Sequence, residues 1–217
     1  MRALVLGLVL AALPPRAALA CEAALVLAMD VSGSVDPGEW RLQADGLAAA
    51  LRDRELREVL VQGQIALAVV QWSALGQQAL TIPWQRMLSA GAVDALSEQV
   101  RRMPRAYPGA DTAVGEALEF ALAQFPAVAD CRRRIVDMSG DGDENVGFTT
   151  SRARRAAIAA GVEVNGLAIE AMGLSITTYY RRWVITPGGF VETARGHLDY
   201  ARAIRAKMLR ELTKPTS

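Results

Sequence analysis

The stretch that most constrains the fold is Ala24–Ser34, with the sequence ALVLAMDVSGS. Its first six residues are apolar, and they are followed by Asp30 and by Ser32 and Ser34 at alternate positions. A short apolar run that ends in a polar, glycine-containing turn predicts a buried strand, here of a parallel sheet covered on both faces. Ligands bind at the carboxyl ends of such strands. The aspartate and the two hydroxyls therefore predict a site for a hard cation such as magnesium, calcium or manganese, rather than zinc or copper.

The rest of the chain alternates between strand and helix patterns. Apolar runs predict further strands at 65–72, 134–138, 162–169 and 190–191, and the segment 77–83, which ends in Pro83, predicts an edge strand. Helical periodicity and end signals predict helices from Asp36 to 51 and over 92–103, 112–125, 149–160, 175–183 and 198–212, and the charged segment 52–58 is interpreted as the end of the first helical unit. This alternation predicts an α/β fold: a doubly wound, mostly parallel sheet with helices on both faces.

The first 20 residues are predicted to be a secretory signal peptide. Arg2 precedes an apolar segment and then the motif Ala18-Leu19-Ala20, which together have the order of a cleavable signal. The apolar segment is shorter than the roughly 20 residues that span a bilayer. We therefore expect cleavage after Ala20, a single domain over 21–217, and a periplasmic or secreted protein with no integral membrane segment. A lipid on Cys21 is a less favoured alternative, because Ala18 stands where lipoprotein signals usually have leucine.

Charge and composition exclude several function classes. The 217-residue chain has a formal charge of +1, which becomes −1 when the two arginines of the signal are removed. A nearly neutral protein gives no reason to expect nucleic acid as a partner. The single histidine, His197, argues against a histidine-rich metal site and against most histidine-based catalysis.

The strand order decides whether the acidic turns meet. In the common order 3-2-1-4-5-6, with 77–83 as the third strand, the strand that ends at Asp30 lies beside the one that precedes Asp141. Thr112, at the predicted start of the helix before that fourth strand, reaches the same rim. Two carboxylates so close repel each other unless a cation lies near them, which gives a physical reason to expect a metal ion.

The same topology predicts a disulfide bond. Cys21 and Cys131 each lie a few residues before one of these two neighbouring strands. Parallel neighbours have their starts side by side, and an exported protein meets an oxidising compartment. We expect a Cys21–Cys131 bridge at the end of the sheet opposite the metal site; the alternative is two free thiols.

Taken together, Asp30-x-Ser32-x-Ser34, Thr112 and Asp141-Gly142 resemble the metal-ion-dependent adhesion site of a von Willebrand factor type A domain. The stretches LVLAMDVSGSVDPGEW, VVQWS, RRIVDMSGDGDENVG and GVEVNGLAIE, with the tail from Tyr179, resemble more closely an uncharacterised family of exported bacterial proteins with this type of domain. The resemblance implies that these five residues hold a divalent cation, Mg²⁺ before Mn²⁺ or Ca²⁺. It also implies a binding function, in which an acidic side chain of a partner protein completes the coordination of the ion.

Four residues beside the site have open roles. The predicted partner-binding rim consists of Asp111, Asp143, Glu144 and Asn145. For the last three the alternative is a solvated turn, and Asp111 either adds charge near the ion or caps the following helix. The alternative to a binding protein is a metal-dependent hydrolase or phosphatase that uses Asp30 and Asp141. We expect no enzyme, because phosphatases of the haloacid-dehalogenase type need a second aspartate where this chain has Ser32, and because His197 is distant in sequence.

Overall fold

The structure is a computed structural model that describes residues 21–109, 111–171 and 173–213. The predicted signal peptide, 1–20, lies outside these residues. The chain forms one six-stranded sheet with the order β3-β2-β1-β4-β5-β6, in which only β3 is antiparallel to its neighbour. The strands are β1 (Ala23–Asp30), β2 (Ala66–Trp72), β3 (Gln78–Arg86), β4 (Arg133–Gly140), β5 (Glu163–Ile169) and β6 (Val191–Ala194). The predicted fold class and strand order are confirmed.

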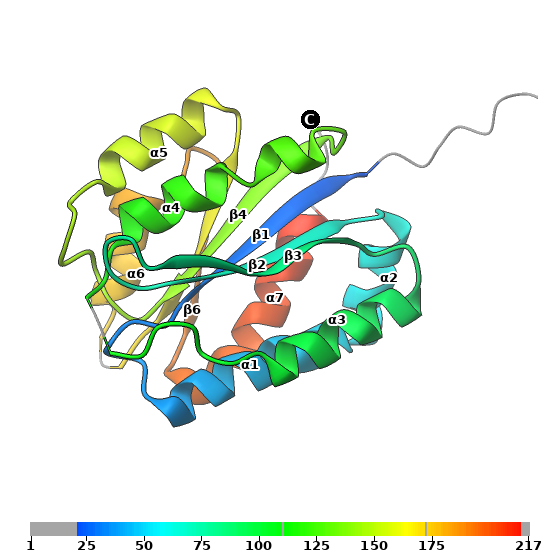
Figure 1. Ribbon diagram of the computed structural model, residues 1–217, viewed down its shortest axis with the longest axis horizontal. Helices are drawn as coiled ribbons and strands as arrows, with labels where there is room; N and C mark the ends of the chain where they lie inside the picture. Colours follow the sequence, from blue (N-terminus) through cyan, green and yellow to red (C-terminus); the bar gives the residue numbers. More distant parts are fainter. Residues whose placement is uncertain (1–20, 110, 172, 214–217) are drawn as a thin grey trace, which may run out of the picture.

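Helices cover both faces of the sheet, as Figure 1 shows. The longer helices are α1 (Pro37–Leu51), α2 (Arg54–Gln62), α3 (Ala90–Arg102), α4 (Val114–Leu122), α5 (Thr150–Ala159) and α7 (Tyr200–Leu212). The shorter turns of helix are η1 (Phe125–Val128), α6 (Ser175–Tyr179), η2 (Tyr180–Val184) and η3 (His197–Asp199). Helices α1, α2, α3 and α7 pack on one face, and α4, α5 and η2 pack on the other.

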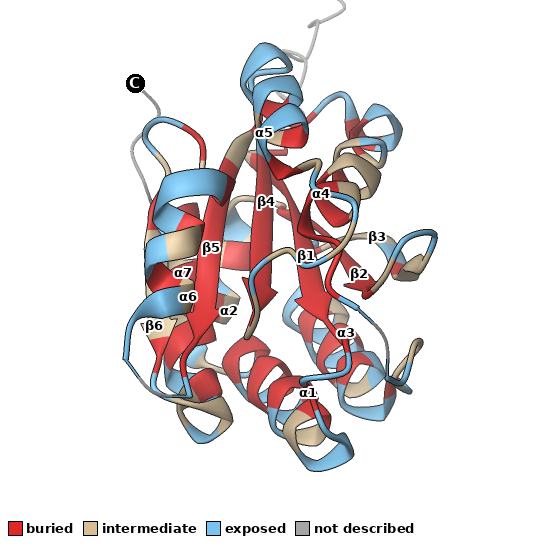
Figure 2. Cartoon of the chain, turned by 90° about the vertical axis from the view of Figure 1, so that its left-hand side faces the viewer, coloured by how far each residue is buried: buried red, intermediate tan, exposed pale blue. Residues whose placement is uncertain are grey.

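The central strand β1 explains why the sheet is buried on both sides. All eight of its residues are buried, and Figure 2 shows the middle strands buried over most of their length. Leu25, Leu27 and Met29 enter the core on the α1 and α7 face, whereas the small residues Ala24, Val26 and Ala28 enter the core on the α4 face. The apolar run predicted as a parallel central strand therefore serves two cores at once.

The predicted start of α1 is confirmed, whereas the sequence patterns do not predict α2 as a helix. Asp36 caps α1 with Glu39 in a capping box, as the sequence predicts. The segment 52–58, interpreted as a charged end, instead enters helix α2, capped by Asp53. Leu56 and Leu60 lie one turn apart and are both buried, and the partly buried Val59 and Val61 pack against the same core, so a few apolar residues among charges dock this helix.

The end of the sheet opposite the aspartates carries the disulfide bond. Cys21 is bonded to Cys131 across a sequence separation of 110 residues, and Ala23 of β1 pairs with Arg133 of β4 directly after the two cysteines. The predicted bridge is confirmed, and the Cys21 sulfur is not free for a lipid. No helix in the described part of the chain has the length and apolar character needed to cross a bilayer.

Candidate metal centre

The first loop places Asp30, Ser32 and Ser34 around one point at the carboxyl end of β1. Oδ1 of Asp30 accepts the backbone N–H of Ser32 at 2.8 Å, and the hydroxyls of Ser32 and Ser34 are 3.2 Å apart. Oδ2 of Asp30 is buried and has no hydrogen-bond partner among the described residues. An unpaired carboxylate oxygen in the interior is costly unless a proton or a cation satisfies it.

Two further loops bring Thr112 and Asp141 to the same point. Oγ1 of Thr112 lies 3.3 Å from Oγ of Ser32, and the Ser34 hydroxyl donates to Oδ1 of Asp141 at 2.5 Å. These contacts link side chains that lie 80 and 107 residues apart in sequence. Hydrogen bonds thus join all five residues into one group, Asp30 through the backbone N–H of Ser32, and their role as metal ligands stays a prediction.

The electrostatics of this group suit a cation. Burial, and after it the charge of Asp141, raises the pKa of Asp30 to about 7. The chain approaches closely here, because a Cβ added to Gly140 would lie 2.8 Å from Oδ2 of Asp30, which explains the glycine at this position. Hard oxygens, an unpaired carboxylate and excess negative charge fit a divalent ion such as Mg²⁺ or Mn²⁺.

Arg105 holds the first loop from outside the group, and sequence reasoning missed it. Its guanidinium donates to the carbonyl oxygens of Val31 at 2.8 Å and Ser32 at 2.7 Å. Gln71 on β2 fixes the arginine's own loop, since its amide bonds to Pro104 and Ala106. The sequence contains no signal for this clamp, because a loop arginine is usually solvated.

The loop that carries Thr112 is held on both sides. The Ser73 hydroxyl donates to the carbonyl oxygen of Asp111 at 3.1 Å, and the backbone N–H of Thr112 donates to Oδ1 of Asn145 at 2.8 Å. A second hydrogen bond runs in the opposite direction, from the backbone N–H of Asn145 to the Thr112 carbonyl oxygen. Asn145 therefore positions Thr112, one of the five residues of the site, through its side chain.

The other rim residues differ in their surroundings. The Glu144 carboxylate accepts the backbone N–H groups of Gly115 and Thr150, at the starts of α4 and α5. Asp111 and Asp143 are exposed. The interpretation of Asp111 as a helix cap is wrong, because α4 begins two residues after Thr112 and its N-cap residue makes no side-chain hydrogen bond. Instead, Glu144 accepts one of the N–H groups that the start of α4 leaves without a partner inside the helix.

His197 lies beside the site although it is distant in sequence. Its Nε2 is 3.9 Å from Oδ2 of Asp141, and its Nδ1 is 3.1 Å from Oε1 of Glu39. The histidine enters from η3, the short turn before α7, so its position depends on how the chain returns over the start of α1. The expectation that distance in sequence removes His197 from the site is wrong.

A family model described as "Protein of unknown function (DUF1194)" matches residues 20–216. The chain belongs to this family. A search of curated proteins found no match.

Solved structures show which fold the DUF1194 chain shares. Proximal thread matrix protein 1 from the mussel byssus, with a zinc-occupied MIDAS motif, superposes with a TM-score of 0.67 at 17% identity, over 87% of this chain and 48% of that one. A von Willebrand factor type A protein from Catenulispora acidiphila gives 0.66 at 18% identity, over 90% and 44%. The pilus adhesin SpaC from Lactobacillus rhamnosus GG gives 0.60 at 14% identity, over 87% and 30%. The chain spans less than half the length of each of these proteins, and the likeness establishes a von Willebrand A-like fold.

Proposed function

We propose that this protein is an exported, divalent-metal-dependent binding domain for a partner protein. Asp30, Ser32, Ser34, Thr112 and Asp141 would hold the ion, Mg²⁺ before Mn²⁺ or Ca²⁺, and a carboxylate of the partner would complete its coordination. The observation that carries the proposal is the buried, unpaired Oδ2 of Asp30 within a connected group of three hydroxyls and a second carboxylate.

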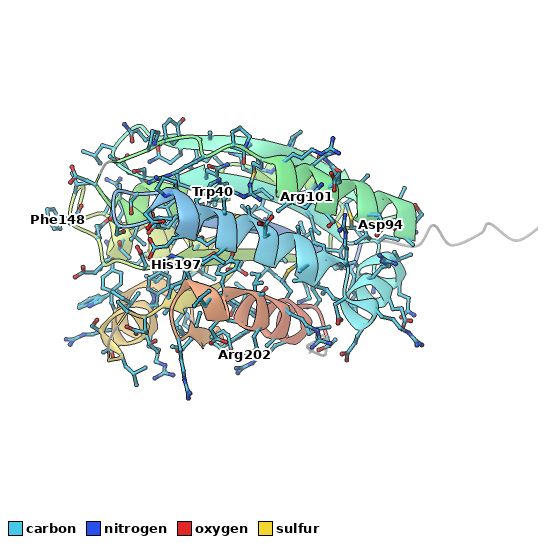
Figure 3. All side chains as sticks on the ribbon, turned by 90° about the horizontal axis from the view of Figure 1, so that it is seen from below. Trp40, Asp94, Arg101, Phe148, His197 and Arg202 are labelled. Atoms are coloured by element: carbon cyan, nitrogen blue, oxygen red, sulfur yellow. A yellow bond between two sulfur atoms is a disulfide. The ribbon has the colours of Figure 1, made fainter. Side chains whose placement is uncertain are left out.

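Exposed apolar side chains around the same edge support a protein partner. Four such side chains, 48% to 86% exposed, lie in the connections that follow β2, β4, β5 and β6: Leu75, Phe148, Leu174 and, in η3, Leu198. Figure 3 shows Phe148 projecting at this end of the molecule. Phe148 also has a φ of 54°, which a bulky side chain rarely adopts. Apolar side chains kept in water around a polar site are typical of a surface that a protein covers.

Similarity to other proteins supports the same proposal. One of the solved neighbours is a pilus adhesin, and another has a metal-occupied MIDAS motif. Those properties belong to the neighbours, and they make an extracellular or periplasmic binding role the first one to test here.

The first experiment measures the ion. Thermal unfolding of the purified protein in EDTA is compared with unfolding in millimolar Mg²⁺, Mn²⁺ or Ca²⁺, for the wild type and for Asp30→Ala. An ion that binds only the native state must raise the Tm as its concentration rises. We expect a rise in the wild type and none in the variant; no rise with any ion, in a folded wild type, contradicts the proposal.

The second experiment measures the open coordination position. With Mn²⁺ bound, water-proton relaxation reports exchangeable water on the ion, and added acetate should lower it by displacing that water. An unchanged relaxation rate at saturating acetate would argue against capture of a carboxylate.

The hydrolase alternative is tested on the same samples with a generic phosphate monoester. Turnover that is lost in Asp30→Asn would overturn the assignment as a binding domain.

A further inference from the structure

The imidazole of His197 is fixed and almost enclosed. Its side chain is 9% exposed, and it lies where η3 passes the first turn of α1 (Figure 3). Its Nδ1 lies 3.1 Å from Oε1 of Glu39, while Oε2 of Glu39 accepts the backbone N–H of Asp36 in the capping box. Each oxygen of Glu39 therefore faces a nitrogen, and the capping box holds the carboxylate beside Nδ1.

The second ring nitrogen has no partner. Nε2 of His197 is buried and makes no hydrogen bond with any described residue. Nε2 lies 3.9 Å from Oδ2 of Asp141, on the side of the ring away from Glu39; an imidazole that carries its proton on Nδ1 would direct the Nε2 lone pair toward this carboxylate. This separation is too long for a hydrogen bond.

The separation is close to that of two ligands of one ion. Ligand atoms at about 2.0–2.2 Å from a tetrahedral zinc ion lie roughly 3.3–3.6 Å apart, so the distance of 3.9 Å between Nε2 and Oδ2 needs to shorten by a few tenths of an ångström. Ligand atoms of Glu39, Asp141 and His197 all lie within 4.8 Å of one another. A histidine that donates its other N–H to a carboxylate is the usual arrangement of a metal-binding imidazole.

We propose that His197 and Asp141 form a second cation site, adjacent to the five-residue group, with Glu39 orienting the imidazole. The nitrogen ligand selects a transition ion of the zinc class over Mg²⁺ and Ca²⁺. Asp141 joins the two sites, since Oδ1 faces Ser34 and Oδ2 faces His197. The second site does not require the first to be loaded.

The test uses the single histidine of the chain. With any affinity tag removed, long-range ¹H–¹⁵N spectra of the imidazole report His197 alone. Without metal we expect the Nδ1–H tautomer, and one equivalent of Zn²⁺ should shift the Nε2 resonance while the Nδ1–H tautomer is retained. Zn²⁺ titration by calorimetry on the same samples gives the stoichiometry and the dissociation constant.

Three variants separate this site from the five-residue group. His197→Gln should raise the Zn²⁺ dissociation constant by at least about 100-fold, and Glu39→Gln by about 10–100-fold, while both keep the Mg²⁺-dependent rise in Tm. Asp30→Ala should lose the Mg²⁺ response and keep the His197 shift. Zinc binding that survives His197→Gln and disappears in Asp30→Ala would overturn the proposal, because zinc would then occupy the five-residue group. A folded wild type whose imidazole spectrum does not respond to Zn²⁺ would overturn it as well.

Discussion

At the scale of single residues, the ionised carboxylate of Asp30 is unfavourable in the metal-free protein, because it is buried and lies near a second carboxylate. Its carboxyl has a pKa of about 7 instead of 3.8, first because of burial and then because of Asp141. The folded state therefore holds a proton that the unfolded state releases, so the metal-free protein loses stability as the pH rises from about 4 to about 7.

Asp30→Asn should remove this loss. In EDTA at pH 8 we expect the free energy of unfolding to increase by about 1–4 kcal/mol, since each pKa unit corresponds to about 1.4 kcal/mol and the asparagine oxygen can still accept from Ser32. Urea unfolding at pH 8 and pH 4 checks it, with little difference expected at pH 4. A variant that is less stable than the wild type in EDTA at pH 8 would contradict this account of Asp30.

Gly140 tests the packing beside the same carboxylate. An added Cβ would lie 2.6 Å from the Tyr180 hydroxyl and 2.8 Å from Oδ2 of Asp30. We expect Gly140→Ala to destabilise the protein by about 1–3 kcal/mol and to abolish the metal-dependent rise in Tm.

The matched control is Gly142→Ala, two residues further along the chain. Its added Cβ would meet Thr112 only at 3.6 Å, an ordinary contact. We expect a change within about 0.5 kcal/mol. Equal effects of the two substitutions, in melts with and without Mg²⁺, would show that Gly140 is not set by its approach to Asp30.

At the scale of elements, β4 and α7 are joined by a buried group of charges. Nζ of Lys207 on α7 lies 2.8 Å from Asp137 of β4 and 2.5 Å from Glu211, and all three side chains are fully buried. One cation faces two carboxylates, so one negative charge is in excess. Burial raises the pKa of Asp137 and brings the pKa of Glu211 to about 7, although Lys207 opposes both shifts.

The excess charge predicts opposite effects of two substitutions. Lys207→Met leaves two buried carboxylates unpaired and should cost about 3–5 kcal/mol at pH 8. Glu211→Gln leaves a balanced pair and an amide that can bond to Lys207 and Asn165. It should remove the part of the stability that the wild type loses between about pH 4.5 and 7, because the raised pKa of Glu211 favours the folded state only while the group is protonated.

Urea unfolding across this pH range measures both substitutions. Asp30 titrates in the same range, so the comparison uses the Asp30→Asn background. An unchanged pH slope in Glu211→Gln would show that the proton is held elsewhere in the group.

These elements also show what the sequence can and cannot reveal. The partnership of Asp30 with Asp141 follows from apolar strands that end in acidic turns, because strand order alone brings such ends together. Helical periodicity does not predict the burial of Lys207 and Glu211, because it assigns charged residues to the solvent face. The position of His197 beside Asp141 cannot be predicted for another reason. It depends on the path of the chain between β6 and α7, which local sequence patterns do not indicate.

At the scale of the whole molecule, β1 and β4 connect two features that constrain the chain, the disulfide bond at one end of the sheet and the candidate metal site at the other. The disulfide Cys21–Cys131 joins their starts, whereas Asp30 is the last residue of β1 and Asp141 directly follows β4. A bridge that closes a loop of this length stabilises a protein by up to about 4–5 kcal/mol in the chain-entropy model and often by less, because it restricts the unfolded chain.

The two constraints should act independently. The double variant Cys21→Ser, Cys131→Ser is expected to lose about 2–5 kcal/mol of stability and to keep the Mg²⁺ affinity of the wild type, because perturbations that share no contacts add. Denaturant unfolding with and without Mg²⁺, on the wild type, the double variant, Asp30→Ala and all three substitutions together, gives the coupling energy directly. A coupling above about 0.5 kcal/mol would mean that β1 and β4 transmit strain along their length, and that the redox state of the bridge controls metal binding at the other end of the sheet.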